Sequence, residues 1–598
     1  MTSPSRRSFL VGSAGVVFTI PLFSAACSDA QHSPYEVTNS GGLQDAWVHI
    51  DPSGAIRIRA AADEMGQGSL TAQPVIFAEE LDADWNDVTV EFSDPDELVF
   101  GNPQPWTLGM MLTAGSSAVP GYFDKLRMNG AQVRKYLLGV AAKQWQVPIE
   151  TLITQPSRII HEASSRTMTY GEAAGLADET AVLPDLSPDE LKSPSEFRLI
   201  GRDIPRRDVP SKIDGSAQYA IDIVVPDMVH ATIVRAPTIE GRVVRVYDRQ
   251  ALAIDGVIEV VQLDDIVAVI ANTYFAALEG ERALSIDWSQ PEIGGDLNSS
   301  EMLETLVATA RDLTSSGAPI QDTGDIESAF AEASIVHAAE YRAEHVYHAQ
   351  MEPLGAVASV MDQGQKVEIW AGTQAPSHLL RSVSTELGIE KSAISLNRLY
   401  SGGGFGRRTT EGQDYILDAV RLSRHLARPV KVTWSREADV RAGCFRPMAG
   451  QVVRVAEDQN GDIAGWHHRI AAQSTLRQAD PFRFTRYAEV PYLSSAGVDT
   501  FYSIPSARGE ILEQAVGARV APLRGVSLPT NEFAAESMMN EVARAKQIDP
   551  IEFRKIHLAQ NWVAMGVLEA VEKISPWQER PGLGVSLVSH GGFRYRFS

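Results

Sequence analysis

Cysteine is almost absent from this sequence. Of 598 residues, only Cys27 and Cys444 carry a thiol. Two thiols are too few for a four-cysteine iron–sulfur cluster, a structural zinc site or a disulfide framework. One chain therefore cannot carry such a cluster alone.

Basic residues are also in short supply. The chain has 53 Lys and Arg residues against 76 Asp and Glu residues, a formal net charge of −23. Such a surface repels phosphate, so we expect no nucleic-acid partner, and any bound anion needs a local site. Hydrophobic residues (44%) and charged residues (22%) occur at globular frequencies, and the length allows about four folding units.

The N-terminus lacks a hydrophobic run of membrane-spanning length. The apolar stretch from Val11 to Ala26 is interrupted by two glycines and a proline, and it is shorter than the roughly 20 residues that cross a bilayer. Because Arg6-Arg7 precedes it, we interpret residues 1–27 as a twin-arginine export signal; a short membrane anchor is the alternative. Cys27 stands where lipoproteins carry their modified cysteine, so we predict a periplasmic protein with an optional lipid anchor.

Apolar periodicity predicts alternating strands and helices along most of the chain. A polar stretch at 177–194 is typical of a linker and suggests a boundary near residue 200, and 201–288 is interpreted as a small separate α/β domain. The predicted strands are 46–50, 55–62, 88–92, 218–224, 257–262, 266–270, 367–370, 394–400 and 430–434, and the predicted helices are 66–81, 122–145, 274–283, 376–387 and 415–425.

The glycine-rich loop Gly402–Arg408 is the most informative local pattern. Clustered glycines permit positive φ and close approach of the backbone to a ligand, and Arg407 and Arg408 could clamp a phosphate or a carboxylate. The spacing is not that of a dinucleotide-binding fingerprint. A glycine-rich connection with two solvated arginines is the alternative.

Three further segments are candidate binding loops. Gly66-Gln67-Gly68 at a helix start could cradle an anion with free amide groups. Thr113–Ser117 offers small hydroxyl residues, or it could be an ordinary helix cap. Gln374, between a strand and a helix, could donate to a ligand oxygen or simply be solvated.

Metal-ligating and acid–base residues cannot be selected from spacing. His345, His348 and Glu352 lie close together but match no zinc motif, so we assign no metal ligand. With 76 acidic residues, pairs of carboxylates arise by chance, and no general base stands out. The residues alone predict an exported enzyme or binding protein with several glycine loops.

Five segments, in order, resemble the molybdopterin-binding subunits of the xanthine dehydrogenase and aldehyde oxidase superfamily, and most of all its isoquinoline 1-oxidoreductase large-subunit type. The match covers nearly all of residues 43–560. The segments are Glu64-Met65-Gly66-Gln67-Gly68, Met351-Glu352-Pro353, Trp370-Ala371-Gly372-Thr373-Gln374-Ala375, Gly402-Gly403-Gly404-Phe405-Gly406-Arg407-Arg408 and Asn531-Glu532-Phe533-Ala534-Ala535-Glu536-Ser537.

The resemblance implies an α+β fold in which molybdopterin-binding domains carry an inserted α/β hammerhead domain. Lys212–Trp288 looks like the hammerhead. The implied division is a signal at 1–27, an N-terminal molybdopterin-binding segment at 43–190, the hammerhead at 201–290, a second molybdopterin-binding domain at 330–565 and an aberrant tail at 580–598.

The resemblance also implies a reaction and a set of site residues. Molybdenum on a molybdopterin cytosine dinucleotide would hydroxylate an electron-poor carbon with oxygen from water. By matching motif, Gln374 would hydrogen-bond an oxo ligand and Arg524 would be the active-site arginine, although Leu523 stands where an aromatic residue is usual. The implied cofactor-binding residues are Gly66, Gln67, Gly68, Gly115, Ser116, Gly403, Gly404, Phe405, Gly406 and Arg407.

The resemblance further implies partners. Electrons leaving molybdenum would pass to a small [2Fe-2S] subunit, since this chain lacks cluster cysteines, and then to a cytochrome c. The substrate would be a small molecule, either an aldehyde or an N-heterocycle.

One departure from the family concerns its C-terminal Gly-x-Gly-Glu motif, whose glutamate deprotonates the metal-bound hydroxide. Gly582-Leu583-Gly584-Val585 has valine in place of that acid, and we suspect a frameshift or premature stop near residue 585. A truncated, non-catalytic remnant that keeps a binding or partner surface is therefore the alternative function. An exported carbohydrate or peptide binder would explain the acidity and the loops, but not five family motifs in order.

Overall fold

The computed structural model describes residues 43–44, 46–177, 182–291, 295–487, 492–577 and 582–589. The predicted export signal, Cys27 and the end of the predicted tail lie outside these residues. The chain forms two compact units: unit 1 is Met1–Ala62, Gln67–Met111 and Ser116–Ser216, and unit 2 is Asp63–Gly66, Leu112–Gly115 and Ala217–Ser598. Both units combine helices with sheets, which confirms the predicted α+β class.

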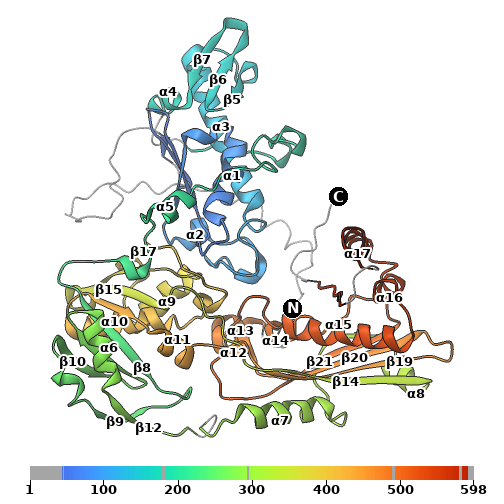
Figure 1. The fold of residues 1–598 in the computed structure, drawn as a ribbon. Helices are drawn as coiled ribbons and strands as arrows, with labels where there is room; N and C mark the ends of the chain where they lie inside the picture. The colour runs from blue at the N-terminus through green and yellow to red at the C-terminus, as the bar shows by residue number, and fades with distance from the viewer. Residues whose placement is uncertain are drawn as a thin grey trace, which may run out of the picture. The chain divides into compact units, whose positions relative to one another are not determined.

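Unit 1 is built on a four-stranded sheet in the order β1-β2-β3-β4, against which two long helices pack (Figure 1). Alternate residues of the strands, such as Val48, Ile50, Ile56 and Ile58, are fully buried, as the period-two pattern predicts. The elements are β1 (Leu43–Gln44), β2 (Val48–Ile50), β3 (Ile56–Ala60), α1 (Ser69–Leu81), β4 (Val88–Phe92), α2 (Glu97–Phe100), α3 (Phe123–Trp145), β5 (Ile153–Gln155), β6 (Arg158–His161), β7 (Arg166–Thr169), α4 (Tyr170–Gly175) and α5 (Val209–Asp214).

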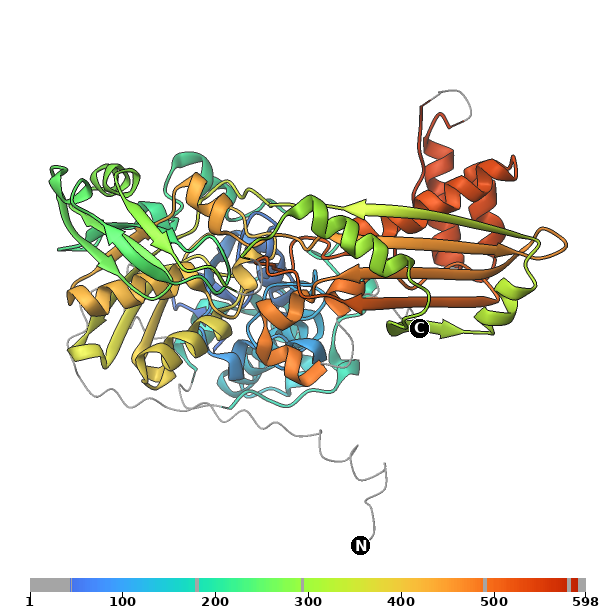
Figure 2. The ribbon, with the colours of Figure 1, turned by 90° about the horizontal axis from the view of Figure 1, so that it is seen from below.

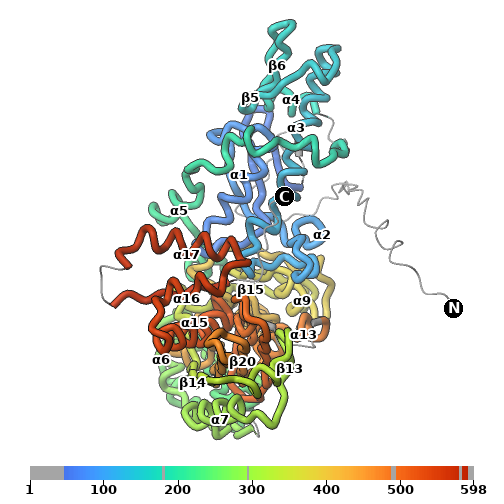
Figure 3. Tube along the Cα trace, turned by 90° about the vertical axis from the view of Figure 1, so that its right-hand side faces the viewer, coloured from blue at the N-terminus to red at the C-terminus, as the bar shows by residue number. Residues whose placement is uncertain are grey.

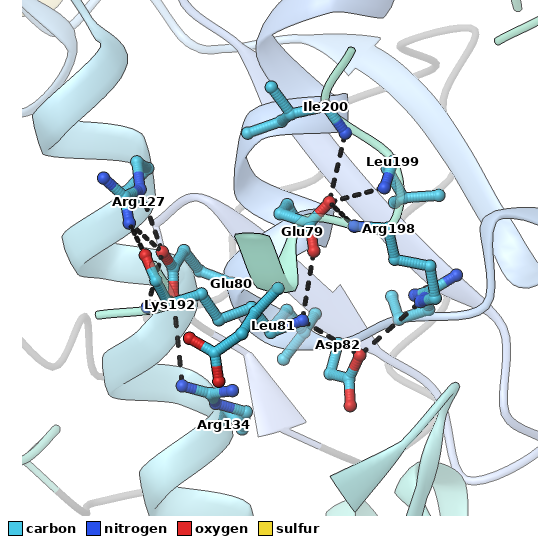
Figure 4. A network of polar contacts seen from close by, with 12 residues as sticks. Glu79, Glu80, Leu81, Asp82, Arg127, Arg134, Lys192, Arg198, Leu199 and Ile200 are labelled. Atoms are coloured by element: carbon cyan, nitrogen blue, oxygen red, sulfur yellow. Dashed lines mark hydrogen bonds and ion pairs between the residues drawn. The ribbon is translucent and has the colours of Figure 1, made fainter. Parts of the chain in front are cut away.

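A buried carboxylate on α1 holds the segment that ends the predicted linker (Figure 4). Glu79 accepts hydrogen bonds from the backbone N–H groups of Leu199 and Ile200 (3.1 Å for Ile200) and from Lys192 Nζ at 3.1 Å. Burial acts to raise the pKa of Glu79, but these donors outweigh it and lower the pKa. The ionised carboxylate therefore fastens 192–200 to α1.

Unit 2 contains a seven-stranded sheet in the order β10-β11-β8-β18-β15-β16-β17. Strand β11 is buried on both faces, and α6 and α10 pack against the sheet. The elements are β8 (Val229–Arg235), β9 (Val243–Tyr247), β10 (Val257–Gln262), β11 (Ile266–Ala271), α6 (Tyr274–Arg282), β12 (Ser285–Trp288), β15 (Gly355–Met361), β16 (Lys366–Ala371), α9 (Pro376–Leu387), β17 (Ile394–Arg398), α10 (Asp414–Leu426), β18 (Val430–Thr433) and α11 (Arg436–Ala442).

Strand β8, from the predicted 201–288 domain, pairs in parallel with β18, so the two share one sheet. One sequence prediction in this region is wrong. Residues 218–224 are not a strand but contain a single helical turn at Ala220–Asp222. There the Asp222 carboxylate accepts the N–H of Tyr219 at 3.0 Å, and this local bond competes with strand pairing.

The second sheet of unit 2 has five strands in the order β13-β21-β20-β19-β14. Its long strands lie side by side (Figure 2), with α7 on one face and α15 on the other (Figure 3). The elements are α7 (Ser299–Arg311), β13 (Ala318–Thr323), α8 (Ile326–Ala331), β14 (Ile335–Ala343), β19 (Ala449–Glu457), β20 (Ile463–Ala472), α12 (Thr475–Ala479), α13 (Pro481–Tyr487), α14 (Tyr492–Ser495), β21 (Ser506–Glu513), α15 (Leu528–Ala545), α16 (Pro550–His557) and α17 (Trp562–Ile574).

Most predicted helices and strands are present within a few residues of the predicted ends. Helix α9 spans the predicted residues 376–387, with Pro376 in its first turn, and it ends before Gly388, whose φ is +69°. No helix among the described residues is both long and apolar enough to cross a bilayer.

Candidate functional site

Three loops of unit 2 meet around Gln374, which lies between β16 and α9. The N–H of Thr113 donates to the carbonyl of Gln374 at 2.7 Å, and the N–H of Gln374 donates to the carbonyl of Arg408 at 3.2 Å. The N–H of Ser401 donates to the carbonyl of Glu64 at 3.0 Å. Segments 63–66, 112–115 and 401–408 are thus joined by backbone hydrogen bonds, although hundreds of residues separate the third segment from the first two in the sequence.

The Gln374 side chain bridges two of these loops. Its Nε2 donates to the carbonyl of Thr113 at 2.9 Å, and its Oε1 accepts the N–H of Gly406 at 2.9 Å. The residue is only 3% exposed. An amide nitrogen has two hydrogens, and the second has no partner among the described residues, so a buried donor is left for a ligand.

The glycine loop adopts the backbone that its sequence predicts. Gly403 and Gly406 have φ of +103° and +100°, and Phe405 between them has φ of +51°. A Cβ added at Gly404 would lie 2.5 Å from Gln374 Oε1, and one at Gly406 would lie 2.0 Å from the carbonyl oxygen of Pro522. Glycine is required at both positions because other parts of the chain approach so closely.

Phe405 links this loop to the predicted arginine. Its carbonyl accepts the N–H of Arg524 at 2.7 Å, and the residue is 38% exposed. The carbonyl of Arg524 in turn accepts a hydrogen bond from Arg446 Nη2 at 2.6 Å, and the Arg524 side chain is exposed. The structure therefore brings Gln374, Gly403, Gly404, Phe405, Gly406 and the Arg524 backbone together.

The two arginines of the loop do not form the predicted clamp. Arg407 is fully buried and pairs with both carboxylate oxygens of Asp414, at 2.9 and 2.7 Å. Arg408 is also fully buried, and it donates to the carbonyls of Gly403 and Gly372 and to Glu352 Oε2 at 2.8 Å. Both side chains stabilise the loop from inside, which corrects the assignment of the Arg407 side chain as a ligand contact and excludes the solvated alternative.

Glu352 and the nearby histidines have structural partners. Glu352 Oε2 also accepts the N–H of Gly402 at 2.8 Å, and its Oε1 accepts the N–H of Ala220 at 3.2 Å. His348 Nε2 contacts Gln350 Oε1 at 2.9 Å, and burial lowers the pKa of His348 to about 4, so the ring is neutral at pH 7. Within the described ranges no group of three His, Cys, Asp or Glu side chains could hold a metal ion.

A buried ion pair that the sequence analysis missed positions the 63–66 loop. Arg398, at the end of β17, donates through Nη2 to Asp63 Oδ1 at 2.8 Å. Thr113 Oγ1 accepts the N–H of Asp63 at 2.9 Å and donates to Asp63 Oδ2 at 3.1 Å, so Thr113 is not a helix cap. Burial raises the pKa of Asp63, against the opposing effect of Arg398. Because Asp63 and Arg398 lie 335 residues apart in the sequence, no local sequence pattern indicates that they pair.

The other predicted cofactor-binding residues are divided between the units. Gly66, with φ of +111°, and Gly115, with φ of +58°, belong to unit 2; the N–H of Gly66 donates to Glu64 Oε1 at 2.8 Å. Gln67, Gly68 and Ser116 belong to unit 1. There Gly68, with φ of +89°, precedes α1, and Gln67 Nε2 donates to Ser69 Oγ at 2.6 Å.

Comparison with known proteins defines the class. The molybdopterin cofactor-binding domain family matches residues 11–195 and 312–558, and the aldehyde oxidase and xanthine dehydrogenase a/b hammerhead domain family matches residues 214–289. The chain therefore belongs to the aldehyde oxidase and xanthine dehydrogenase family, whose members are molybdopterin-dependent oxidoreductases, and the resemblance found in the sequence is confirmed.

Two curated proteins and one solved structure are similar to this chain over much of its length. Isoquinoline 1-oxidoreductase subunit beta of Brevundimonas diminuta is 31% identical over 96% of this chain and 78% of that protein. The membrane-bound aldehyde dehydrogenase (pyrroloquinoline-quinone) of Gluconacetobacter polyoxogenes is 30% identical over 92% of this chain and 72% of that protein. The quinoline 2-oxidoreductase structure from Pseudomonas putida 86 shares the fold, with a TM-score of 0.52 and 19% identity over 63% of this chain and 54% of that one.

Proposed function

We propose that this chain is the cofactor-binding large subunit of a molybdenum hydroxylase that oxidises an aldehyde or an N-heteroaromatic compound with oxygen from water. The observation that carries the proposal is the buried Gln374 amide, which keeps one donor hydrogen where three loops meet. The relatives, among them an isoquinoline oxidoreductase and an aldehyde dehydrogenase, support both substrate classes.

The residues present fit a molybdenum–molybdopterin cofactor. When bound, the cofactor supplies two-electron redox chemistry at a metal carried by its own dithiolene sulfurs, so no cluster of protein ligands is needed. Gln374 Nε2 would donate its remaining hydrogen to a cofactor oxygen. Gly404 and Gly406 let the loop backbone pack against Gln374 and the Pro522 carbonyl, which would hold the loop in place beside the cofactor.

The surrounding residues keep this arrangement rigid. Arg408 and Glu352 lock the glycine loop, and the Asp63–Arg398 pair locks the 63–66 loop. Because these charges satisfy one another inside the protein, the loops are held in place before the cofactor arrives, which reduces the entropy lost on binding. The exposed Arg524 side chain, next to Phe405, would orient a substrate.

The finer assignments extend the proposal. We infer a cytosine dinucleotide form of the cofactor, a small [2Fe-2S] subunit that receives electrons, and a cytochrome c beyond it. The scarcity of cysteine supports the separate cluster subunit. Residues 1–27 would direct the folded protein to the periplasm by the twin-arginine route, with a lipid anchor on Cys27. Mass spectrometry of the mature N-terminus tests both the cleavage and the modification.

Metal and nucleotide analysis tests the central proposal. The full chain, produced with molybdenum-cofactor maturation proteins, should contain close to one molybdenum atom per chain and release a cytidine nucleotide in acid. Replacing Gln374 by Ala should lower the molybdenum content while circular dichroism stays unchanged. Gln363→Ala, on a surface turn after β15, is the control. Gln413→Ala is unsuitable because Gln413 accepts a hydrogen bond from Thr373, next to Gln374. Full-length, folded protein without molybdenum would refute the proposal.

A further inference from the structure

A cavity of 310 Å³ lies in unit 2, where the turn after β8 meets the segments that follow α11 and β21. Its lining residues all belong to unit 2 and include Thr238, His345, Arg441 and Arg519. The loop residues described around Gln374 are not part of this lining, so the cavity is separate from the proposed cofactor site. Its volume corresponds to roughly ten water molecules, which is enough for a small ion and its hydration shell.

Arg519 brings a positive charge to the cavity that no carboxylate of the described residues cancels. Its Nη2 donates to the carbonyls of Ala236 and Thr238, at 2.7 and 2.9 Å, and its Nη1 donates to a third carbonyl at 3.4 Å. A guanidinium has five N–H groups, so further donors remain for a ligand. The two carboxylates that act on this charge already pair with other arginines: Asp265 with Arg235, and Asp414 with Arg407.

Arg441 adds a second positive charge from α11. Its side chain is exposed and forms no hydrogen bond or ion pair within the described ranges. Its charge acts on Glu281 of α6, but Glu281 does not line the cavity. The described lining contains no Asp or Glu at all. In a protein with a net charge of −23, this is a local site that attracts anions.

His345 and Thr238 contribute buried polar atoms that lack partners. His345 Nδ1 lies 3.0 Å from the carbonyl oxygen of Arg446, which can only accept, so Nδ1 carries the hydrogen. Burial lowers the pKa of His345, so the ring is neutral at pH 7 and Nε2 is an acceptor. In the part of the chain that the structure describes, neither His345 Nε2 nor Thr238 Oγ1 has a hydrogen-bond partner. A ligand that carries an O–H group would satisfy Nε2.

We propose that this cavity binds hydrogen phosphate, with Arg441 and Arg519 holding its charged oxygens and His345 Nε2 accepting its O–H. Every phosphate species present at pH 7 carries both a negative charge and an O–H group, whereas sulfate has the same shape and carries charge alone. A phosphomonoester has a second pKa of about 6 and is mostly without an O–H at pH 7, so the chemistry favours the free ion. This inference does not rest on the proposed function.

Calorimetric titration of the full chain with inorganic phosphate at pH 7 tests this inference, with sulfate and methyl phosphate as the comparison anions. We expect saturable binding of one phosphate per chain, with the other two anions bound roughly tenfold more weakly because neither satisfies His345. His345→Phe keeps an aromatic ring but removes the acceptor, so phosphate should lose its advantage over sulfate.

Arg441→Gln tests the charge without disturbing the fold, because the Arg441 side chain has no bond to lose among the described residues. Phosphate should bind roughly tenfold more weakly to this variant. Arg424→Gln is the matched control: it removes an exposed arginine of α10 that does not line the cavity, and it should bind phosphate like the unaltered chain.

Three results would overturn the inference: no saturable binding of phosphate, equal affinity for sulfate, or equal weakening in the two arginine variants. Unaltered phosphate preference in His345→Phe would also contradict it. Because none of these measurements needs molybdenum, failure here is distinguishable from failure of the metal analysis that tests the proposed function.

Discussion

Replacing Gly406 by Ala tests whether the glycine loop is fixed by backbone contact. The residue has φ of +100°, and a Cβ would lie 2.0 Å from the oxygen and 2.9 Å from the carbon of the Pro522 carbonyl. A left-handed backbone costs an L-residue about 1–2 kcal/mol. Overpacking adds about 1–3 kcal/mol, because the obstacle is main chain and cannot rotate away. The expected loss of unfolding free energy is therefore roughly 2–5 kcal/mol.

Urea unfolding of unit 2, followed by tryptophan fluorescence, measures this loss. Trp434 and Trp466 are buried in that unit and report on its core. Gly412→Ala is the matched control, because an added Cβ there meets nothing within 4 Å, and it should change stability by less than about 0.5 kcal/mol. Since Gly406 also donates its N–H to Gln374, the Gly406 variant should lose molybdenum as well. Equal unfolding midpoints for the two variants would refute the argument.

Three further predictions concern buried charges. Lysine in Arg408→Lys keeps the charge but cannot reach the two carbonyls and Glu352 at once. The urea midpoint should therefore fall by the equivalent of about 3 kcal/mol. An unchanged midpoint would contradict the role of Arg408 in holding the loop from inside. Glu79 has a lowered pKa in the folded chain, so its stabilisation is present above its unfolded pKa of 4.5 and is lost as pH falls; Glu79→Gln should remove that part of the acid dependence, measured by thermal unfolding from pH 7 to 3. Glu532 affects the pH dependence of stability in the opposite direction, because burial raises its pKa to about 8 and the folded chain therefore loses stability as pH rises from 4.5. Glu532→Gln should be roughly 3 kcal/mol more stable than the unaltered chain at pH 7 and equal to it at pH 4. A stability difference that does not change with pH would contradict the effect of burial on Glu532.

Local signals in the sequence predicted local structure well. The predicted helix 376–387 coincides with α9, whose first residue is Pro376, and the glycines of 402–406 predicted a loop with positive φ. These features depend on the residue itself and its immediate neighbours, so they can be inferred without knowing what packs against them. The family resemblance then placed Gln374 next to that loop, which no spacing rule could do.

Features that depend on distant pairing were missed or misjudged. Arg407 and Arg408 were expected to face a ligand, yet both side chains turn inward, because Asp414 and Glu352 accept their hydrogen bonds there. The Asp63–Arg398 pair joins residues 335 apart, and its charges have no periodic or local signature. Tertiary packing decides which way a side chain points and which partner it binds. The residues of one segment alone do not predict either.

The parallel pairing of β8 with β18 affects how the chain folds as it is made. Strand β8 (Val229–Arg235) lies between β11 and β18 in the seven-stranded sheet. Its neighbour β18 (Val430–Thr433) comes about 200 residues later in the sequence. During synthesis at about 5–20 residues per second, β8 waits at least several seconds with one edge unpaired. An open apolar edge of this kind invites pairing with other chains. Slower translation across the intervening segment would lengthen that exposure and increase aggregation.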